Sequence, residues 1–161
     1  MADSGSDGEP EHESPRERMN RNWNELLQEL RVAQTGVQIL TAFLLTLPFQ
    51  PAFEELKDSR TYVYVAVLLS AMTSMLCLLT PVALHRALFR RGLKPWLVKT
   101  ANVVTRAGLV LLVAANVGAV WLVMDTVLGL PSASIASGVL IGLVTIGWMV
   151  LPAWVLRTQR D

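Results

Sequence analysis

The chain has 161 residues, of which 52% are hydrophobic and 17% are charged, and its formal net charge is +1. Soluble domains carry about 25% charged residues, so the composition excludes an ordinary soluble domain, and the near-zero charge offers no general attraction for nucleic acid. Four windows without a charged residue or histidine are long enough, at about 18 residues or more, to cross a membrane. They are Val32–Phe53, Thr61–Leu84, Ala107–Met124 and Thr126–Leu156. The sequence therefore predicts an all-α integral membrane protein, a four-helix bundle forming a single membrane domain over residues 21–161.

An acidic segment precedes the first window. Residues 1–18 contain six acidic side chains, two arginines and almost no apolar side chain. Such a segment cannot bury enough surface to offset its loss of conformational entropy, so residues 1–20 are expected to be a disordered acidic tail. An acidic start is unlike a signal peptide, which makes the first span an uncleaved anchor. Translation from Met1 and from Met19 are both open at this point.

The first ordered element is expected to begin at Asn22. Asn22 followed by Glu25 matches a capping box at the start of a helix. Apolar residues of one helical face follow at spacings of three and four; they are Trp23, Leu26, Leu27 and Leu30. This short amphipathic helix is predicted to lie at the membrane surface and to run without a break into the first span.

Prolines, glycines and polar residues bound the four spans. The spans are predicted at about residues 33–53, 61–84, 105–126 and 134–156. Pro48 and Pro51 each remove a backbone donor, which predicts a kink or a frayed end to the first span.

The remaining helix ends follow from the same residue types. The second helix is expected to bend at Pro81 and to run on to Gly92, a normal residue after a helix end. Pro95 is expected to begin the next helix. Gly129 and Pro131 end the third span, and the fourth helix is expected to restart at a serine, either Ser132 or Ser134.

Lysine and arginine are concentrated on one side of the predicted membrane. The N-terminal flank, the loop between the second and third spans and the C-terminal end together carry 12 of them, whereas the other two loops carry two. Because basic residues accumulate in cytoplasmic loops, both termini are predicted to be cytoplasmic and the protein to lie in the cytoplasmic (inner) membrane.

Two segments resemble a known family: Leu26–Phe53, LLQELRVAQTGVQILTAFLLTLPFQPAF, and Thr80–Gly92, TPVALHRALFRRG. They are similar to small actinobacterial membrane proteins of unknown function with four predicted spans, over roughly residues 20–130. Some members carry the label sodium:proton antiporter. The resemblance implies the four-span topology and assigns no role to any residue.

Small residues recur at four-residue spacing in the last two spans. Ser134, Gly138 and Gly142 form a ladder in the fourth span, and Ala114 and Gly118 share the spacing in the third. Small residues let helix backbones approach closely in a membrane. The favoured interpretation is packing between the third and fourth spans, and the alternative is a dimer face.

Each span carries a polar residue at similar depth; these are Thr41, Ser74, Asn116 and Thr145. An unpaired amide in hydrocarbon costs several kcal/mol, so Asn116 is expected to face the bundle. Gln34, Gln38 and Thr41 form a polar stripe along the first span that joins this layer. The favoured interpretation is hydrogen bonding between helices, and the alternative is a polar path for a transported ion.

Asp125 is the candidate ion-binding residue. Coupled transport normally needs a buried carboxylate, and none lies inside the four windows. Asp125 comes one residue after the third window and leads the candidates. The plainer interpretation places it in headgroup water, paired with Lys57 or Arg60.

A cluster of charges is expected on the cytoplasmic side. Glu25 and Glu29 are predicted to lie close to a basic hairpin at residues 85–99, which includes His85, Arg86 and Arg90. His85 and Arg86 are either a pH-sensing pair facing these glutamates or an anchor in the interface. The basic hairpin is expected to attract anionic lipid headgroups.

Catalysis and metal binding are not expected. The chain has one cysteine, Cys77, and two histidines outside the spans, which leaves no metal, haem or other cofactor site and no catalytic constellation. The favoured hypothesis is a non-enzymatic accessory or interaction protein whose partner is a second copy or another membrane protein. The alternative is a small proton- or sodium-coupled transporter. The sequence specifies neither the partner nor a substrate.

Overall fold

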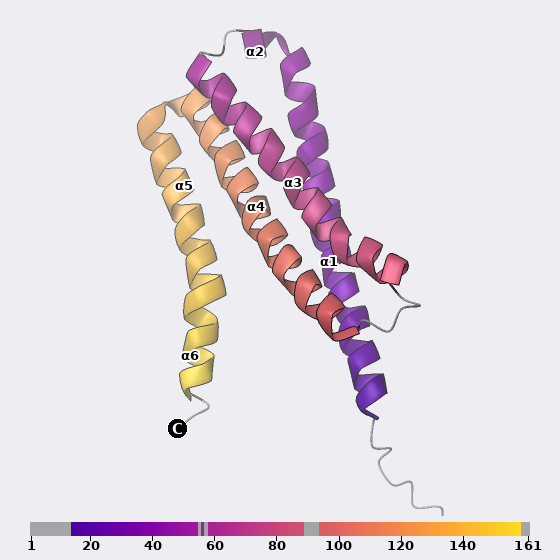
Figure 1. Ribbon diagram of the computed structural model, residues 1–161. Helices are drawn as coiled ribbons and strands as arrows, with labels where there is room; N and C mark the ends of the chain where they lie inside the picture. Colours follow the sequence, from indigo (N-terminus) through magenta and orange to yellow (C-terminus); the bar gives the residue numbers. More distant parts are fainter. Residues whose placement is uncertain (1–13, 55, 57, 89–93, 159–161) are drawn as a thin grey trace, which may run out of the picture.

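The computed structural model describes residues 14–54, 56, 58–88 and 94–158. All elements in this part of the chain are helical, as predicted. The main helices are α1 Pro15–Thr46, α2 Pro51–Glu54, α3 Asp58–Leu88, α4 Lys94–Leu128, α5 Leu130–Thr145 and α6 Leu151–Thr158. The long helices run alternately up and down, so α1 begins and α6 ends at the same end of the molecule (Figure 1). We call this the terminal end and the opposite one the far end.

Four stretches of helix are long and apolar enough to span a membrane. They are Leu27–Phe49, Asp58–Leu84, Thr100–Leu128 and Leu130–Thr158. The last stretch, here called the fourth span, combines α5, the π-helical turn η2 (Ile146–Val150) and α6. The predicted all-α membrane bundle of four helices is confirmed.

The first helix begins earlier than predicted. Ser14 is its N-cap, and the Ser14 N–H donates to Glu17 Oε2 at 2.9 Å while the Glu17 N–H donates to Ser14 Oγ at 3.3 Å. This capping box satisfies two free backbone donors. The prediction that Asn22 caps the helix and that residues 15–20 belong to a disordered tail was therefore wrong. Residues 1–13 lie outside the described part of the chain.

The amphipathic segment and the first span form one continuous helix, as predicted. Leu30 is buried and Leu27 is half-buried, whereas the side chains of Trp23 and Leu26 lie outside the described part of the chain. At the far end, Pro48 belongs to a short 3₁₀ helix, η1 (Leu47–Phe49), which α2 follows. The predicted break at the prolines is confirmed.

The other helix boundaries agree in part. Described α3 residues extend to Leu88 and include Pro81, while Gly92 lies outside the described part of the chain. Pro95 is the second residue of α4, close to the predicted start. Gly129, with φ +86°, precedes α5, which begins at Leu130. The fourth helix therefore does not start at Ser132 or Ser134, because the left-handed glycine reverses the chain earlier.

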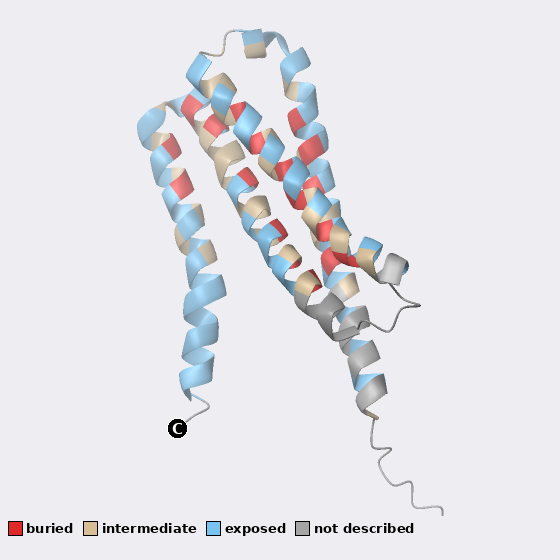
Figure 2. Cartoon of the chain, viewed as in Figure 1, coloured by how far each residue is buried: buried red, intermediate tan, exposed pale blue. Residues whose placement is uncertain are grey.

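A seven-residue repeat of buried side chains joins α1, α3 and α4. In α1 the buried residues are Leu30, Val37 and Leu44, and in α4 they are Ala101, Gly108, Ala115 and Leu122, each seven residues after the last. In α3 the spacing alternates between three and four residues, through Tyr64, Val67, Ala71, Ser74 and Leu78. This is the pattern of coiled-coil packing, which keeps one seam of each helix facing its neighbours. Helix α3 packs on both α1 and α4, and the buried residues lie along these seams (Figure 2).

The fourth span stands apart from this core. Only Ala133 and Ser137 of α5 are buried, and no described residue of η2 or α6 is. Helix α5 packs on α4 near the far end and diverges from it toward the terminal end (Figure 1). Most of the span is consequently pale blue in Figure 2, the colour of exposed residues.

Candidate functional site

An ion pair with a buried carboxylate joins α3 to α4 at the far end. Arg60 Nε donates to Asp125 Oδ2 at 2.7 Å, and Arg60 Nη2 donates to the Asp125 backbone oxygen at 3.1 Å. The Asp125 side chain is 5% exposed and that of Arg60 is 25% exposed. Of the two partners considered for Asp125, the structure selects Arg60, and Lys57 lies outside the described part of the chain.

The predicted polar path does not assemble. Gln34 Nε2 donates across the helix interface to the Leu78 backbone oxygen at 2.8 Å, and Thr41 is buried, but Gln38 is exposed. Asn116 is exposed as well, and its amide donates to Leu112 O of its own helix at 2.8 Å. The prediction that Asn116 faces the bundle was wrong, because a carbonyl one turn back serves its amide instead.

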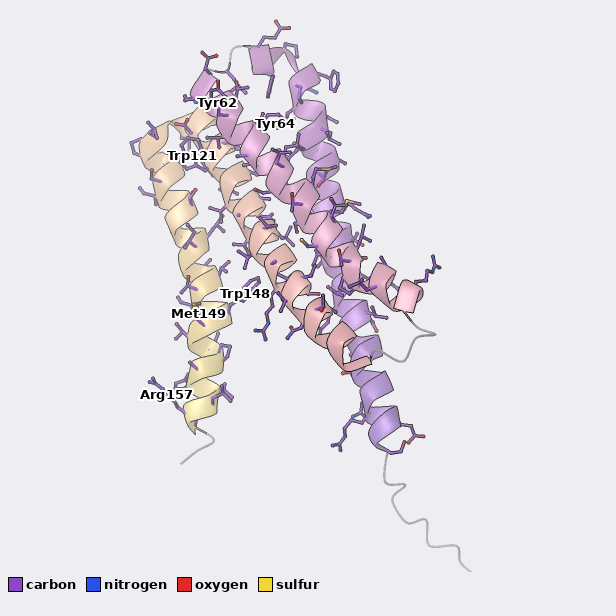
Figure 3. The ribbon with its side chains drawn as sticks, viewed as in Figure 1. Tyr62, Tyr64, Trp121, Trp148, Met149 and Arg157 are labelled. Atoms are coloured by element: carbon purple, nitrogen blue, oxygen red, sulfur yellow. The ribbon has the colours of Figure 1, made fainter. Side chains whose placement is uncertain are left out.

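Two further polar side chains join helices across the core. Ser74 Oγ donates to the Gly108 backbone oxygen at 2.7 Å, and the Tyr64 hydroxyl donates to Leu44 O at 3.0 Å. Tyr64 lies between α3 and α1 (Figure 3) and packs edge-on against Phe53, with ring centroids 5.0 Å apart. These donors tie side chains to backbone carbonyls, the kind of bond that holds membrane helices together. Ser74 was among the polar residues predicted at similar depth in the spans, whereas Tyr64 was not predicted as a site residue.

Three buried hydroxyl oxygens make no hydrogen bond within the described part of the chain: Thr41 Oγ1, Thr105 Oγ1 and Ser137 Oγ. They come from α1, α4 and α5, and Thr41 was among the predicted path residues. Most hydroxyls in membrane helices bond to a carbonyl of their own helix or a neighbour. The three groups therefore carry a small cost of desolvation.

The small-residue ladder does not pack against α4. Helix α5 contacts α4 through Ala133 and Ser137, whereas Ser134 and Gly138 are exposed. A Cβ atom added at Gly138 or Gly142 would meet nothing within 4 Å. The third and fourth spans do pack together, but the interpretation that this ladder forms their interface was wrong, because the packed stripe lies one position before the ladder.

The two small residues of the third span, Ala114 and Gly118, have surroundings that differ from those of the ladder. Ala114 is exposed, but Gly118 faces α3, and a Cβ atom added there would lie 2.5 Å from Val67 Cγ2. Gly108 is equally confined, since its added Cβ would lie 2.9 Å from Cys77 Cβ. These two glycines set the close approach of α3 and α4.

The predicted charge cluster is resolved only in part. Glu25 Oε1 lies 3.8 Å from Arg21 Nε, one turn back on the same helix. Glu29 and Arg86 are exposed, and the side chains of His85 and Arg90 lie outside the described part of the chain. Proximity of Glu25 and Glu29 to the basic hairpin stays a prediction.

No group of three or more His, Cys, Asp or Glu side chains comes together within the described residues. Apart from the three unpaired hydroxyls, the described polar groups of the core form one ion pair and several single hydrogen bonds to carbonyls. Such an arrangement fastens helices to one another.

Comparison with known proteins identifies a family that the chain matches. The model of a family described as "Family of unknown function (DUF6328)" matches residues 12–152, most of the chain. No curated protein and no solved structure matches the chain significantly.

Proposed function

We propose that this chain, which belongs to DUF6328, a family of unknown function, is a non-enzymatic interaction protein of the cytoplasmic membrane. Its partner is a transmembrane helix of another polypeptide, which packs against the fourth span. The observation that carries the proposal is that none of the fourth span's most apolar window is buried by the rest of the molecule.

The exposed face of the fourth span has the surface that membrane helices use for association. Lipid tails are as apolar as leucine, so the hydrophobic effect does not drive helices together inside a bilayer. Close backbone contact does, and it requires small residues. Ser134 and Gly138 supply them on an exposed face, and the half-buried Gly142 continues the row with open space where a side chain would start. Met149, further along the span, is 71% exposed (Figure 3).

Site-specific photo-crosslinking in native membranes tests this proposal. A photoreactive amino acid replaces Val139 of the fourth span or Ile39 of α1, both apolar and more than half exposed. We expect a discrete protein adduct from position 139 and none from position 39. A doubled mass identifies a second copy, and another mass identifies a different membrane protein.

Two matched glycine variants separate association from misfolding. Gly138 and Gly36 both have open space where a side chain would start, and both lie in membrane helices. Gly138→Leu should abolish the adduct from position 139, whereas Gly36→Leu should leave it unchanged. An adduct that survives Gly138→Leu, or no protein adduct at all, contradicts the proposal.

A small proton- or sodium-coupled transporter is the second candidate, and burial of the Asp125 carboxylate favours it. Against it, the carboxylate is engaged by Arg60, whose guanidinium does not give up its proton, and the predicted path residues do not meet. We therefore expect no flux of protons, sodium, lithium or potassium in liposomes driven by a pH gradient. Robust flux that Asp125→Asn abolishes would establish the transporter instead.

The orientation in the membrane is part of the proposal. Four spans put both termini on one side, and the basic residues near that side favour the cytoplasm. A reporter that is active only outside the cytoplasm should be silent after Thr158 and active when inserted between α2 and α3. The opposite pattern contradicts this orientation.

A further inference from the structure

An open hollow lies along the last turns of α3, near the terminal end. Its volume is about 550 Å³, and the described residues that line it are Leu79, Val82, Ala83 and Arg86. Ligand pockets commonly measure roughly 300–1,000 Å³, so the hollow is large enough for part of a sizeable molecule. Three of these four described side chains are apolar, and the fourth, Arg86, is a cation.

The position of Arg86 in the membrane identifies the depth of the hollow. The candidate span that contains α3 ends at Leu84, so Arg86 follows two residues beyond the apolar stretch. That is the level of lipid headgroups, to which arginine side chains extend from helix ends. Arg86 is exposed, and no described residue forms an ion pair with it.

The apolar part of the hollow lies on the hydrocarbon side of Arg86. Val82 is 44% exposed and Leu79 is 36% exposed, and both precede Leu84, inside the span. Pro81, between them in sequence, is fully buried against the core. The apolar wall is thus held in place by a residue that cannot rotate outward without unpacking α3.

We infer that this hollow is a binding site for an anionic phospholipid. The phosphate of the headgroup binds the Arg86 guanidinium, which can donate two parallel hydrogen bonds to phosphate oxygens. One acyl chain lies against Leu79, Val82 and Ala83. The lipid is placed here independently of any partner of the fourth span.

Charge selects an anionic lipid over a neutral one. The sequence from Arg86 to Arg106 contains six lysines and arginines and no acidic residue. A basic residue near a membrane surface contributes about 1 kcal/mol of attraction to anionic lipids. A zwitterionic lipid offers the same phosphate but adds a cation, which this stretch repels.

Lipid retention measured by native mass spectrometry tests the site. The full chain, released from mild detergent, is mixed with equal amounts of phosphatidylglycerol and phosphatidylcholine. We expect a one-to-one complex that prefers phosphatidylglycerol. Arg86→Gln should lower the bound phosphatidylglycerol about fivefold, the change that corresponds to one such contact.

Two further variants distinguish the hollow from general surface charge. Arg157→Gln removes an exposed arginine at the end of α6 that is not among the described residues lining this hollow, and should leave retention unchanged. Ala83→Trp keeps Arg86 but fills the hollow, and should also lower retention. We expect all three variants to fold, because the substituted residues are exposed. Far-ultraviolet circular dichroism measures their helix content.

The inference is overturned by either of two results. One is equal retention of both lipids by the unmodified chain. The other is an Arg86→Gln variant that retains phosphatidylglycerol as well as Arg157→Gln does, since the attraction would then come from the basic surface as a whole.

Discussion

The third and fourth membrane spans have the same mean hydropathy, 2.2, yet 17% of the most apolar window of one is buried within the molecule and none of the other. Hydropathy measures how readily a helix enters lipid, and both helices enter equally well. It carries no information on which protein surface a helix meets afterwards. Packing inside the membrane depends on small residues and on hydrogen bonds between helices.

The same residue types have different surroundings in the two spans. Gly118 of the third span is confined by Val67, and Gly108 accepts the hydroxyl of Ser74 at its carbonyl oxygen. In the fourth span Gly138 has free space, and the hydroxyl of Thr145 bonds to Ile141 O of its own helix at 2.8 Å. The third span is thus bonded to its neighbour across the interface, whereas the hydroxyl of Thr145 bonds within its own helix and holds no other helix of the chain.

Removing one member of the buried ion pair should damage the core most. Asp125→Ala leaves the Arg60 guanidinium without its partner, and breaking such a pair costs roughly 3 kcal/mol, the low end of the usual range because Arg60 is 25% exposed. The free energy of unfolding in mixed micelles measures this loss. The double variant Arg60→Met, Asp125→Leu should lose less than Asp125→Ala, because no charge is left unpaired. Unchanged stability in Asp125→Ala would mean that the pair contributes nothing.

A pair of identical substitutions compares the two spans directly. Gly118→Ala forces a Cβ to within 2.5 Å of Val67 Cγ2, and overpacking of this kind costs about 1–3 kcal/mol. Gly138→Ala meets open space and removes backbone freedom from the unfolded chain, so stability should rise by up to about 1 kcal/mol. Both are read from unfolding free energies. Equal losses in the two variants would remove the distinction between a packed and an unpacked span.

Removing single hydroxyl groups should show the same difference between the core and the fourth span, with smaller changes in the free energy of unfolding. Ser74→Ala removes a bond between helices, worth about 0.6–1.7 kcal/mol in membranes, whereas Thr145→Ala removes a bond within one exposed helix and should change stability little. Thr41→Val replaces a buried hydroxyl that has no described partner, and should be neutral or stabilising. Destabilisation by Thr41→Val comparable to that of Ser74→Ala would indicate an unseen partner for Thr41.

The smallest effect concerns the helix starts. The Ser14 backbone N–H, and then its hydroxyl, lower the pKa of the Glu17 carboxyl below its ordinary value of 4.5. The ionised capping box therefore supports the first turn of α1 fully above pH 4.5, and this support is lost as the pH falls through the lowered pKa. Carbon-13 shifts of Glu17 measure the titration, and Ser14→Ala should bring its pKa part of the way back. The start of α5, which has neither a side-chain cap nor an acidic first turn, should show no fraying over the same range.

Sequence reasoning located the four spans because their lengths and apolar content are large, local signals. The start of α1 also has a local sequence signal, because Ser14 and Glu17 are spaced as in a capping box. The acidic composition of residues 1–18 led instead to the prediction of a disordered segment. The seven-residue seam of the core was not predicted and emerges only from the burial of its side chains. Hydropathy alone does not reveal this seam, since lipid-facing and core-facing residues of a membrane helix are equally apolar.

The wrong predictions at the candidate sites have two causes: the direction in which a helix face points, and the hydrogen-bond partner that a polar side chain selects. The packed stripe of α5, Ala133 and Ser137, lies one position before the ladder, and one position is about 100° of rotation around a helix. The placement of Asn116 assumed that only another helix would satisfy an amide in lipid, whereas Leu112 O of its own helix does. The choice of Arg60 for Asp125 depends on how α3 and α4 meet at the far end, which no local pattern specifies.

The π-helical turn determines where the two halves of the fourth span point. At Ile146–Val150 the Leu151 N–H donates to the Ile146 oxygen, five residues back, directly before Pro152. A turn with one extra residue rotates all later side chains by about 100° relative to those before it. Trp154 and Arg157 therefore lie about 100° around the helix from where an unbroken α-helix would place them, and deleting one residue between 146 and 150 would restore α-helical geometry while leaving their direction unchanged.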